Sequence, residues 1–303
     1  MTPCLPVYLS CFFARPAASA GVSGGVSGNG VGRLAIAVAV LAAGVLHGAG
    51  RASAATFTAE HGDIGVAYDS ATAPTEFEME LHVGQGGVVD GTTISDADGQ
   101  AYEPDEIAIG VPAAANLRRI NNPTGVWGGT ADGYDFTGSS YDGMGVAAGG
   151  NLWVLSFDGT DADHYGTPFL GWATEEGFAG ENFTTGVTFS VSSFAGPSGG
   201  TMGVYTALGS NQWLLSDGDT DFSGDAFTIG TDAHVHRVLM FSEPGSYLVG
   251  INASATHATH GLVSGSAVYE FSVVPEPSGL ALAGMGLAAV GVAVRSAGRR
   301  RRG

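Results

Sequence analysis

The stretch Thr75-Glu76-Phe77-Glu78-Met79-Glu80-Leu81-His82-Val83 alternates polar and apolar side chains without a break. Successive side chains of a β-strand point to opposite faces, so the apolar set would share one face and the polar set the other. The apolar set is Phe77, Met79, Leu81 and Val83. This period of two predicts a strand with one face in a core and one face in water.

Similar runs recur along the chain between turns rich in glycine, aspartate and serine. They are Ile107–Val111, Val187–Val191, Tyr247–Ile251 and Tyr269–Val273. Leu152–Phe157 is apolar on both faces, which predicts a central strand. Residues 90–100 and 121–141 are expected to be long loops. No sustained helical periodicity accompanies these runs, so the sequence predicts an all-β fold, an antiparallel β-sandwich of which the jelly roll is one form.

The charge is distributed unevenly along the 303 residues. All eleven cations are arginines, and eight of them lie outside residues 57–274. That central part holds three arginines and 28 carboxylates, a formal charge of −25. Such a surface repels nucleic acid and anionic lipid and attracts cations, so we expect no nucleic-acid partner. It is equally typical of a merely solvated, soluble surface.

The two cysteines, Cys4 and Cys11, both lie in the N-terminal lead. The central domain therefore has no disulfide and no thiolate for metal binding or catalysis.

The N-terminal part has the order of a secretory signal. Arg33 precedes the apolar run Leu34–Leu46, and the small residues Ala52-Ser53-Ala54-Ala55 follow. This order is typical of a cleavable signal peptide, whose apolar helix is too short to span a bilayer comfortably. We expect signal peptidase to cleave after Ala54 or Ala55. Residues 1–55 would then be lead and signal, and residues 56–274 the exported ectodomain.

The C-terminal residues 275–303 have a different signature. Pro275-Glu276-Pro277 is followed by an apolar stretch, Gly279–Val294, and then by Arg295 and the cluster Arg299–Arg302. The apolar stretch predicts a membrane helix of about 16 residues, shorter than the roughly 20 residues that span a bilayer. Arginines at its end must reach the membrane surface to make up this difference in length. Basic flanks at both ends of the chain belong on the cytoplasmic side, which places the ectodomain outside.

This tail resembles the PEP-CTERM sorting signal of Gram-negative bacteria. The resemblance rests on Pro275, Glu276 and Pro277, on the apolar helix and on the terminal arginines. It implies recognition by an exosortase, a membrane-embedded cysteine transpeptidase that processes the tail and passes the protein to the exterior. We therefore expect a protein of the cell envelope, the outer surface or the extracellular matrix, anchored at its C-terminus permanently or in transit. The alternative is a plain membrane anchor.

The ectodomain resembles the choice-of-anchor M domain of surface-anchored proteins. The resemblance rests on His61-Gly62-Asp63, on Tyr102–Glu106, on Leu152–Leu155 and on the segment His234–Tyr247, although Leu239 replaces an aromatic residue of that pattern. It implies a surface protein without a defined reaction.

His234 and His236 are the best candidates for metal ligands. Two residues apart on a strand, they would point to one face, a geometry that suits chelation. His61, Asp63, His82 or His164 are the groups that would complete a site. The alternative is a pair of surface histidines without an ion.

Two acidic segments are weaker candidates, for calcium. Asp217, Asp219 and Asp221 offer carboxylate oxygens in a flexible stretch, but an EF-hand would have glycine at position 222. Asp158, Asp161 and Asp163 beside His164 form the second segment. Acidic turns are common without an ion.

The chain lacks the P-loop and the zincin motif H-E-x-x-H, and its G-x-S-x-G match at Gly196–Gly200 lies in a segment that is expected to be a turn. We therefore expect a non-enzymatic surface or matrix protein, adhesive or structural, with surface polysaccharide as one conceivable partner. The alternative is a metal-dependent or sugar-binding module that uses His234 and His236. The four tryptophans are either core residues or sugar-stacking platforms.

Overall fold

The computed structural model describes residues 54–130, 133–206, 211–216, 222 and 224–276. The predicted signal helix, the apolar stretch 279–294 and Pro277 lie outside these residues. Within the described part, no helix is long and apolar enough to cross a membrane.

The described chain is almost entirely β-structure, which confirms the all-β prediction. One large sheet contains twelve strands, with the main order β14-β11-β17-β18-β6-β1-β10-β15. Its strands are β1 (Ala55–Tyr68), β2 (Phe77–Val83), β3 (Val88–Val89), β4 (Thr92–Thr93), β5 (Gln100–Tyr102), β6 (Ile107–Val111), β10 (Pro168–Thr174), β11 (Val187–Ala195), β14 (Ala226–Ile229), β15 (His234–His236), β17 (Gly245–His257) and β18 (Gly261–Val273).

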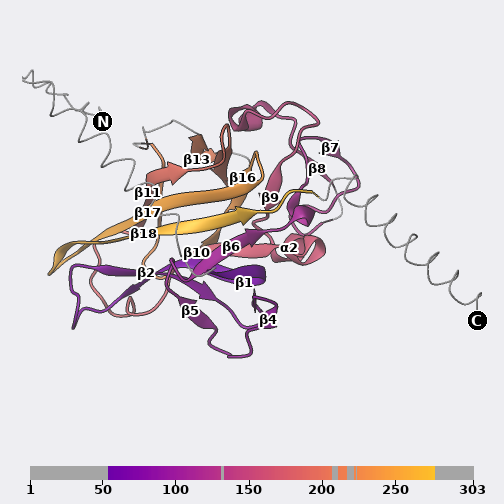
Figure 1. Cartoon of the computed structure of the whole chain (residues 1–303). Helices are drawn as coiled ribbons and strands as arrows, with labels where there is room; N and C mark the ends of the chain where they lie inside the picture. The colour runs from indigo at the N-terminus through magenta and orange to yellow at the C-terminus, as the bar shows by residue number, and fades with distance from the viewer. Residues whose placement is uncertain (1–53, 131–132, 207–210, 217–221, 223, 277–303) are drawn as a thin grey trace, which may run out of the picture. The chain divides into compact units, whose positions relative to one another are not determined.

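A second sheet has the order β13-β12-β16-β9 and packs against the large one (Figure 1). Its strands are β9 (Trp153–Leu155), β12 (Thr201–Tyr205), β13 (Asn211–Ser216) and β16 (Val238–Phe241). Aromatic residues of both sheets, such as Phe241 and Phe271 with ring centroids 5.4 Å apart, meet in one buried core. This is the layered arrangement of a sandwich.

The large sheet is not purely antiparallel, and here the prediction was incomplete. Strand β1 runs parallel to both β6 and β10, and β18 runs parallel to β6. Strand β1 pairs with β6 up to Phe57 and with β10 from Glu60 onward. Glu60 has a φ of 69°, a conformation that L-residues rarely adopt, and it lies where β1 changes partner.

The alternating segment that predicted the fold behaves as expected. In β2 the apolar residues from Phe77 to Val83 are buried, while the residues between them are exposed or half-buried. Strand β9, by contrast, is an edge strand of its sheet rather than the central strand predicted from Leu152–Phe157. It is nevertheless buried on both faces, because the segment from Leu117 to Met144 covers its outer side with a second small core.

The remaining elements are short. They are the hairpin β7 (Asn121–Asn122) with β8 (Tyr134–Asp135), the 3-10 helices η1 (Ala113–Ala115) and η2 (Ser139–Met144), and the α-helix α2 (Gly159–Tyr165). Arg119, only 7% exposed, fixes the surrounding loops through bonds to the carbonyls of Phe136 and Val146 and an ion pair with Asp142.

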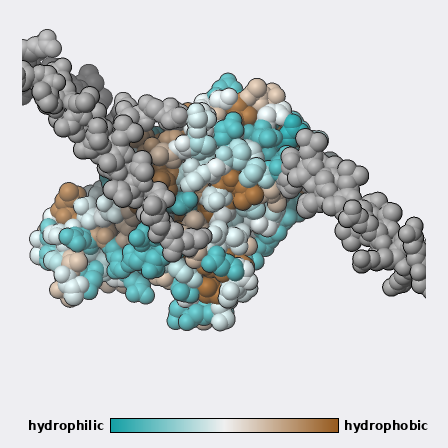
Figure 2. Space-filling view, in the orientation of Figure 1, coloured by the Kyte–Doolittle hydropathy of each residue, from teal (hydrophilic) through white to brown (hydrophobic). Residues whose placement is uncertain are grey.

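On the face shown in Figure 2, hydrophobic residues form separate patches between hydrophilic ones. The large hydrophobic residues that are exposed in the described part all lie on or directly after the last hairpin. They are Leu248, Leu262, Val268 and Val274.

Candidate metal centre

Three histidines converge on one face of the large sheet, at its β15 edge. His61 lies on β1, and His234 and His236 lie on β15. One ring nitrogen from each falls within 4.8 Å of the other two. The structure thus places His234 and His236, the pair predicted from its spacing, beside His61. His61 precedes His234 by 173 residues in the sequence.

Strand pairing explains why these side chains meet. Strand β10 lies between β1 and β15, with Gly171 opposite both Asp63 and His236. Gly171 has no side chain, so Asp63 and His234 extend over its backbone. A Cβ atom at position 171 would overlap Asp63 Oδ1 and His234 Nε2.

Asp63 adds a carboxylate to the cluster. Its Oδ1 atom lies 2.7 Å from His234 Nε2 and 3.5 Å from His61 Nε2, and these two nitrogens are 3.2 Å apart. Four ligands arranged tetrahedrally at zinc–nitrogen distances of about 2.0–2.1 Å would be about 3.3 Å from each other. The separations of 3.2 and 3.5 Å lie near this value, whereas the 2.7 Å contact has the length of a hydrogen-bonded ion pair.

Asp63 is the buried carboxylate of this cluster, and the nearest polar neighbours of its Oδ1 atom are the histidines themselves. Asp63 is 6% exposed, and its Oδ1 has no partner in good hydrogen-bond geometry, although His234 Nε2 is close. A buried carboxylate without such a partner is unfavourable unless a cation compensates it.

His236 is oriented by its other nitrogen. Its Nδ1 atom donates a hydrogen bond to the Leu170 carbonyl at 3.0 Å, which leaves the Nε2 lone pair free. Phe169 stacks on the same ring, with centroids 3.8 Å apart and planes inclined by 8°. Metal-binding histidines are typically held by such contacts.

Protonation favours a ligand role for two of the histidines. Burial lowers the pKa of His236 to about 4 and also lowers the pKa of His61, so both rings are neutral at pH 7. The contact with the Asp63 carboxylate raises the pKa of His234. A metal ion would displace that proton.

Other polar residues surround the cluster. His82 pairs with Asp63 across β1 and β2, but its Nδ1 atom lies 3.4 Å from Glu175 Oε2 and its Nε2 atom 2.8 Å from the Asp98 carbonyl. His82 therefore holds Glu175 rather than the ligands. Glu175, Asp232 and His234 line a hollow of about 180 Å³ beside the cluster. Glu175 was missed by the sequence analysis, because nothing in its local sequence indicates that β10 lies beside β1.

The other predicted ligands fall elsewhere. His164 is exposed on α2 and does not belong to the three-histidine group. Asp217, Asp219 and Asp221 lie outside the described residues. Ala54 and Ala55, the predicted cleavage positions, lie directly before and at the start of β1.

The acidic segment 158–163 does not form the loop that the sequence suggested. It forms the start of α2, where the Asp158 side chain accepts a hydrogen bond from the Thr160 amide. Asp161 is fully buried and accepts bonds from the Gly128 and Gly129 amides and from the Ser156 hydroxyl. These carboxylates are structural, because the protein itself uses their oxygens.

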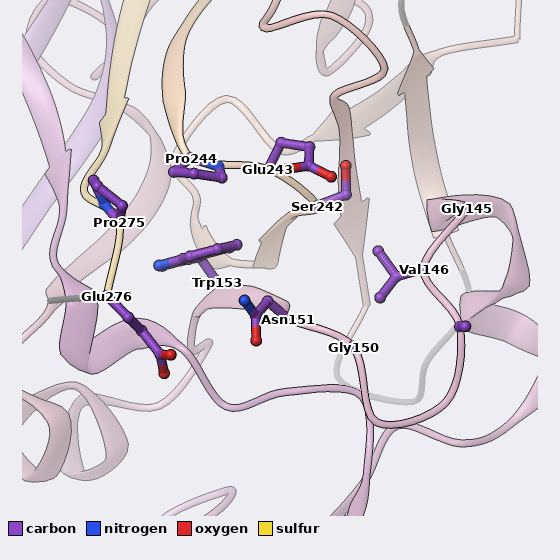
Figure 3. Close-up of a pocket in the computed structure, with 11 residues that line it drawn as sticks. Gly145, Val146, Gly150, Asn151, Trp153, Ser242, Glu243, Pro244, Pro275 and Glu276 are labelled. Atoms are coloured by element: carbon purple, nitrogen blue, oxygen red, sulfur yellow. The ribbon is translucent and has the colours of Figure 1, made fainter. Parts of the chain in front are cut away.

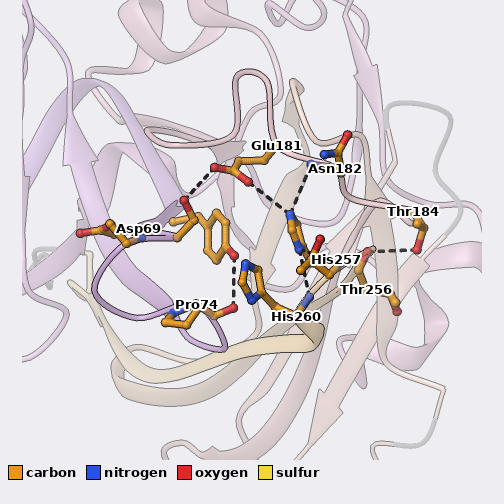
Figure 4. A network of polar contacts seen from close by, with 12 residues as sticks. Asp69, Pro74, Glu181, Asn182, Thr184, Thr256, His257 and His260 are labelled. Carbon is orange, nitrogen blue, oxygen red and sulfur yellow. Dashed lines mark hydrogen bonds and ion pairs between the residues drawn. The ribbon is translucent and has the colours of Figure 1, made fainter.

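In a second histidine cluster, both ring nitrogens of His257 have partners from the protein (Figure 4). His257 is 3% exposed, and its Nδ1 atom accepts bonds from the Thr259 and His260 amides, each at 3.2 Å. Its Nε2 atom lies 3.2 Å from Glu181 Oε2. The cluster ties the turn between β17 and β18 to the loop that contains Glu181.

Comparison with known proteins does not assign this site to a family. No family model, no curated protein and no solved structure matches the chain.

Proposed function

We propose that the protein is an exported surface protein whose β-domain binds one transition-metal ion through His61, His234 and His236, with Asp63 as the fourth ligand. The observation that carries this proposal is the set of 2.7–3.5 Å separations among His61 Nε2, His234 Nε2 and Asp63 Oδ1. Imidazole nitrogen suits zinc, copper, iron and nickel and does not suit calcium. Zinc fits best, because three imidazoles and one carboxylate complete a tetrahedron.

We further propose that this centre binds metal without catalysing a reaction. Catalytic zinc sites usually have three protein ligands and keep one position open for water or substrate. In the proposed centre the buried carboxylate of Asp63 would take the position that a catalytic water otherwise takes. The centre then serves to retain an ion or to hold the β15 edge of the sheet against β1.

Zinc titration of the full-length chain, freed of metal with EDTA, tests the proposal. We expect one zinc ion per chain in the wild type and in His164→Ala, whose histidine is exposed on α2. His236→Ala should bind at least 100-fold more weakly, because it removes one of four ligands. Absence of saturable zinc binding, or equal affinity in wild type and His236→Ala, would contradict the proposal.

The proposed export rests on the two ends of the sequence. We propose that signal peptidase removes residues 1–55 and that an exosortase recognises Pro275-Glu276-Pro277, with residues 279–294 as the membrane segment. Intact mass and fractionation of the protein from its native cells, beside a Pro275→Ala/Glu276→Ala variant, test this. Wild type that has lost both ends and reaches the exterior, with a variant retained in the membrane, is the expected result. Wild type and variant that both keep the tail and fractionate alike would make the motif incidental.

A further inference from the structure

A larger cavity, separate from the histidine cluster, lies beside Pro275 and Glu276 at the C-terminal end of the described residues (Figure 3). Its volume is about 650 Å³, within the range of ligand pockets, which is about 300–1,000 Å³. It shares no lining residue with the metal centre. The residues that matter for its chemistry are Asn151, Trp153, Glu243, Pro244, Pro275 and Glu276.

The walls of this cavity are held by hydrogen bonds of the main chain. Arg119 exchanges two such bonds with the loop beneath, from its amide to the Gly150 carbonyl at 2.8 Å and from the Gly149 amide to its carbonyl at 2.7 Å. The Val274 amide donates to the Val111 carbonyl at 2.9 Å, which fixes the chain just before Pro275. The cavity is therefore formed before any ligand arrives.

The opposite wall is fixed in the same way. The Tyr247 hydroxyl donates to the Glu243 carbonyl at 2.7 Å and accepts from the Glu243 amide at 3.1 Å. These bonds hold the backbone of Glu243 and leave its exposed side chain at the cavity.

The charge of the lining restricts the class of ligand. Glu243 and Glu276 are carboxylates, and none of the described residues that line the cavity is an arginine or a lysine. The surrounding domain carries 28 carboxylates against three arginines. An anionic ligand would be repelled both locally and by the field of the whole domain.

Hydrogen-bonding groups of both kinds meet at this cavity. The carboxylates of Glu243 and Glu276 accept, and the Asn151 amide both donates and accepts. Trp153 is 2% exposed, and its indole N–H has no partner among the described residues. Figure 3 shows the indole nitrogen on the side of the ring that faces Pro275 and Glu276. This nitrogen is enclosed by the protein, so Trp153 forms the floor of the cavity and the carboxylates and the amide are the groups that a ligand can reach.

We propose that this cavity binds a neutral saccharide, as a sugar unit of an uncharged surface polysaccharide. Each sugar hydroxyl both donates and accepts, which matches the mixture of carboxylates and amide. The rings of Pro244 and Pro275 supply apolar surface for the C–H faces of a sugar ring. The absence of a cation from the lining is what favours a neutral sugar over a uronic acid.

Titration calorimetry with the full-length chain tests this proposal. The neutral probes are cellohexaose, mannohexaose and a galactan oligosaccharide, and the anionic probe is polygalacturonate. We expect saturable binding of at least one neutral probe and none of polygalacturonate. Asn151→Ala and Glu243→Ala should each weaken binding about tenfold. Glu78→Ala, which removes an exposed carboxylate from β2, is the matched control and should bind like the wild type.

The outcomes are distinct from those for the metal centre. Binding should persist in EDTA and in His236→Ala, because the cavity contains none of the metal ligands. The proposal is overturned if no neutral probe binds saturably at millimolar concentration. It is also overturned if Asn151→Ala and Glu243→Ala bind the probe as well as wild type, or if only polygalacturonate binds.

Discussion

The histidines at the β15 edge and the histidine at the turn after β17 are bonded in opposite ways. Both ring nitrogens of His257 have partners from the protein, and the ring is almost fully buried. At the other cluster, nitrogens of His61 and His234 face each other and a buried oxygen of Asp63. The first arrangement is complete as it stands, whereas the second becomes favourable when a cation is bound. We infer from this difference that His257 stabilises the fold, whereas the histidines at the β15 edge bind a metal ion.

Replacing His257 should have the largest effect on stability. His257→Ala leaves Glu181 Oε2 and the amides of Thr259 and His260 without their present partner, and it removes a ring that is only 3% exposed. We expect the free energy of unfolding to fall by about 3 kcal/mol, measured by urea unfolding with an unchanged m-value.

The exposed His164 provides the control for this substitution. His164→Ala should change stability by less than about 0.5 kcal/mol. Zinc affinity should be unchanged in both variants. A stability loss below about 1 kcal/mol in His257→Ala, or a loss of zinc binding, would remove the contrast between the two clusters.

The substitution Gly171→Ala tests the histidine cluster without removing any ligand. The added methyl group would overlap Asp63 Oδ1 and His234 Nε2, so the ligands could no longer converge over position 171. We expect zinc affinity to fall about 100-fold, which corresponds to about 2.7 kcal/mol. Competition with a chromophoric chelator measures it.

Gly138→Ala is the matched control for that experiment. An added Cβ at position 138 would find its nearest neighbour, Ser140 Oγ, at 3.8 Å, and the backbone there is one that alanine adopts readily. Its zinc affinity should equal that of wild type. An unchanged affinity in Gly171→Ala would mean that the ligands do not meet over β10.

These residues also show how much could be predicted from sequence. The alternation in Thr75–Val83 is local, so it identified β2 and its buried face correctly. The spacing of His234 and His236 predicted that both would point to one side of a strand, and His61 and Asp63 were among the groups considered as partners. What could not be predicted was the parallel pairing of β1 with β10, because parallel strands are brought together by contacts far apart in sequence.

The same limit explains the residues that were missed. Gly171 matters only because Asp63 and His236 lie on either side of it, and Glu175 only because β10 ends beside β1 and β2. Burial of β9 on both faces was predicted from its composition, but its position at a sheet edge was not, since a covering loop and a neighbouring strand bury apolar side chains equally well.

His82 is an intermediate case between the two clusters, and its pH dependence gives the smallest effect. The hydrogen bond to Glu175 raises the pKa of His82 to about 9, from an ordinary value of 6.5. A raised pKa means that the folded state binds the proton more tightly than the unfolded state does. The resulting stabilisation is fully present below pH 6.5 and is lost as the pH rises to 9.

We expect about 1 kcal/mol of stability to be lost across that window, since water screens this partly exposed pair. Urea unfolding of the EDTA-treated protein at pH 6.5 and pH 9 measures the loss. His82→Gln should reduce it, while His234, whose pKa is also raised by Asp63, contributes a loss of the same sign in both proteins. Burial lowers the pKa of His236 to about 4, so that group affects stability only below pH 6.5 and leaves the window undisturbed. Equal slopes in wild type and His82→Gln would mean that Glu175 is not held by His82. Glu175 would then be free to turn toward the metal centre, whereas its contact with His82 now holds it away from the ligands.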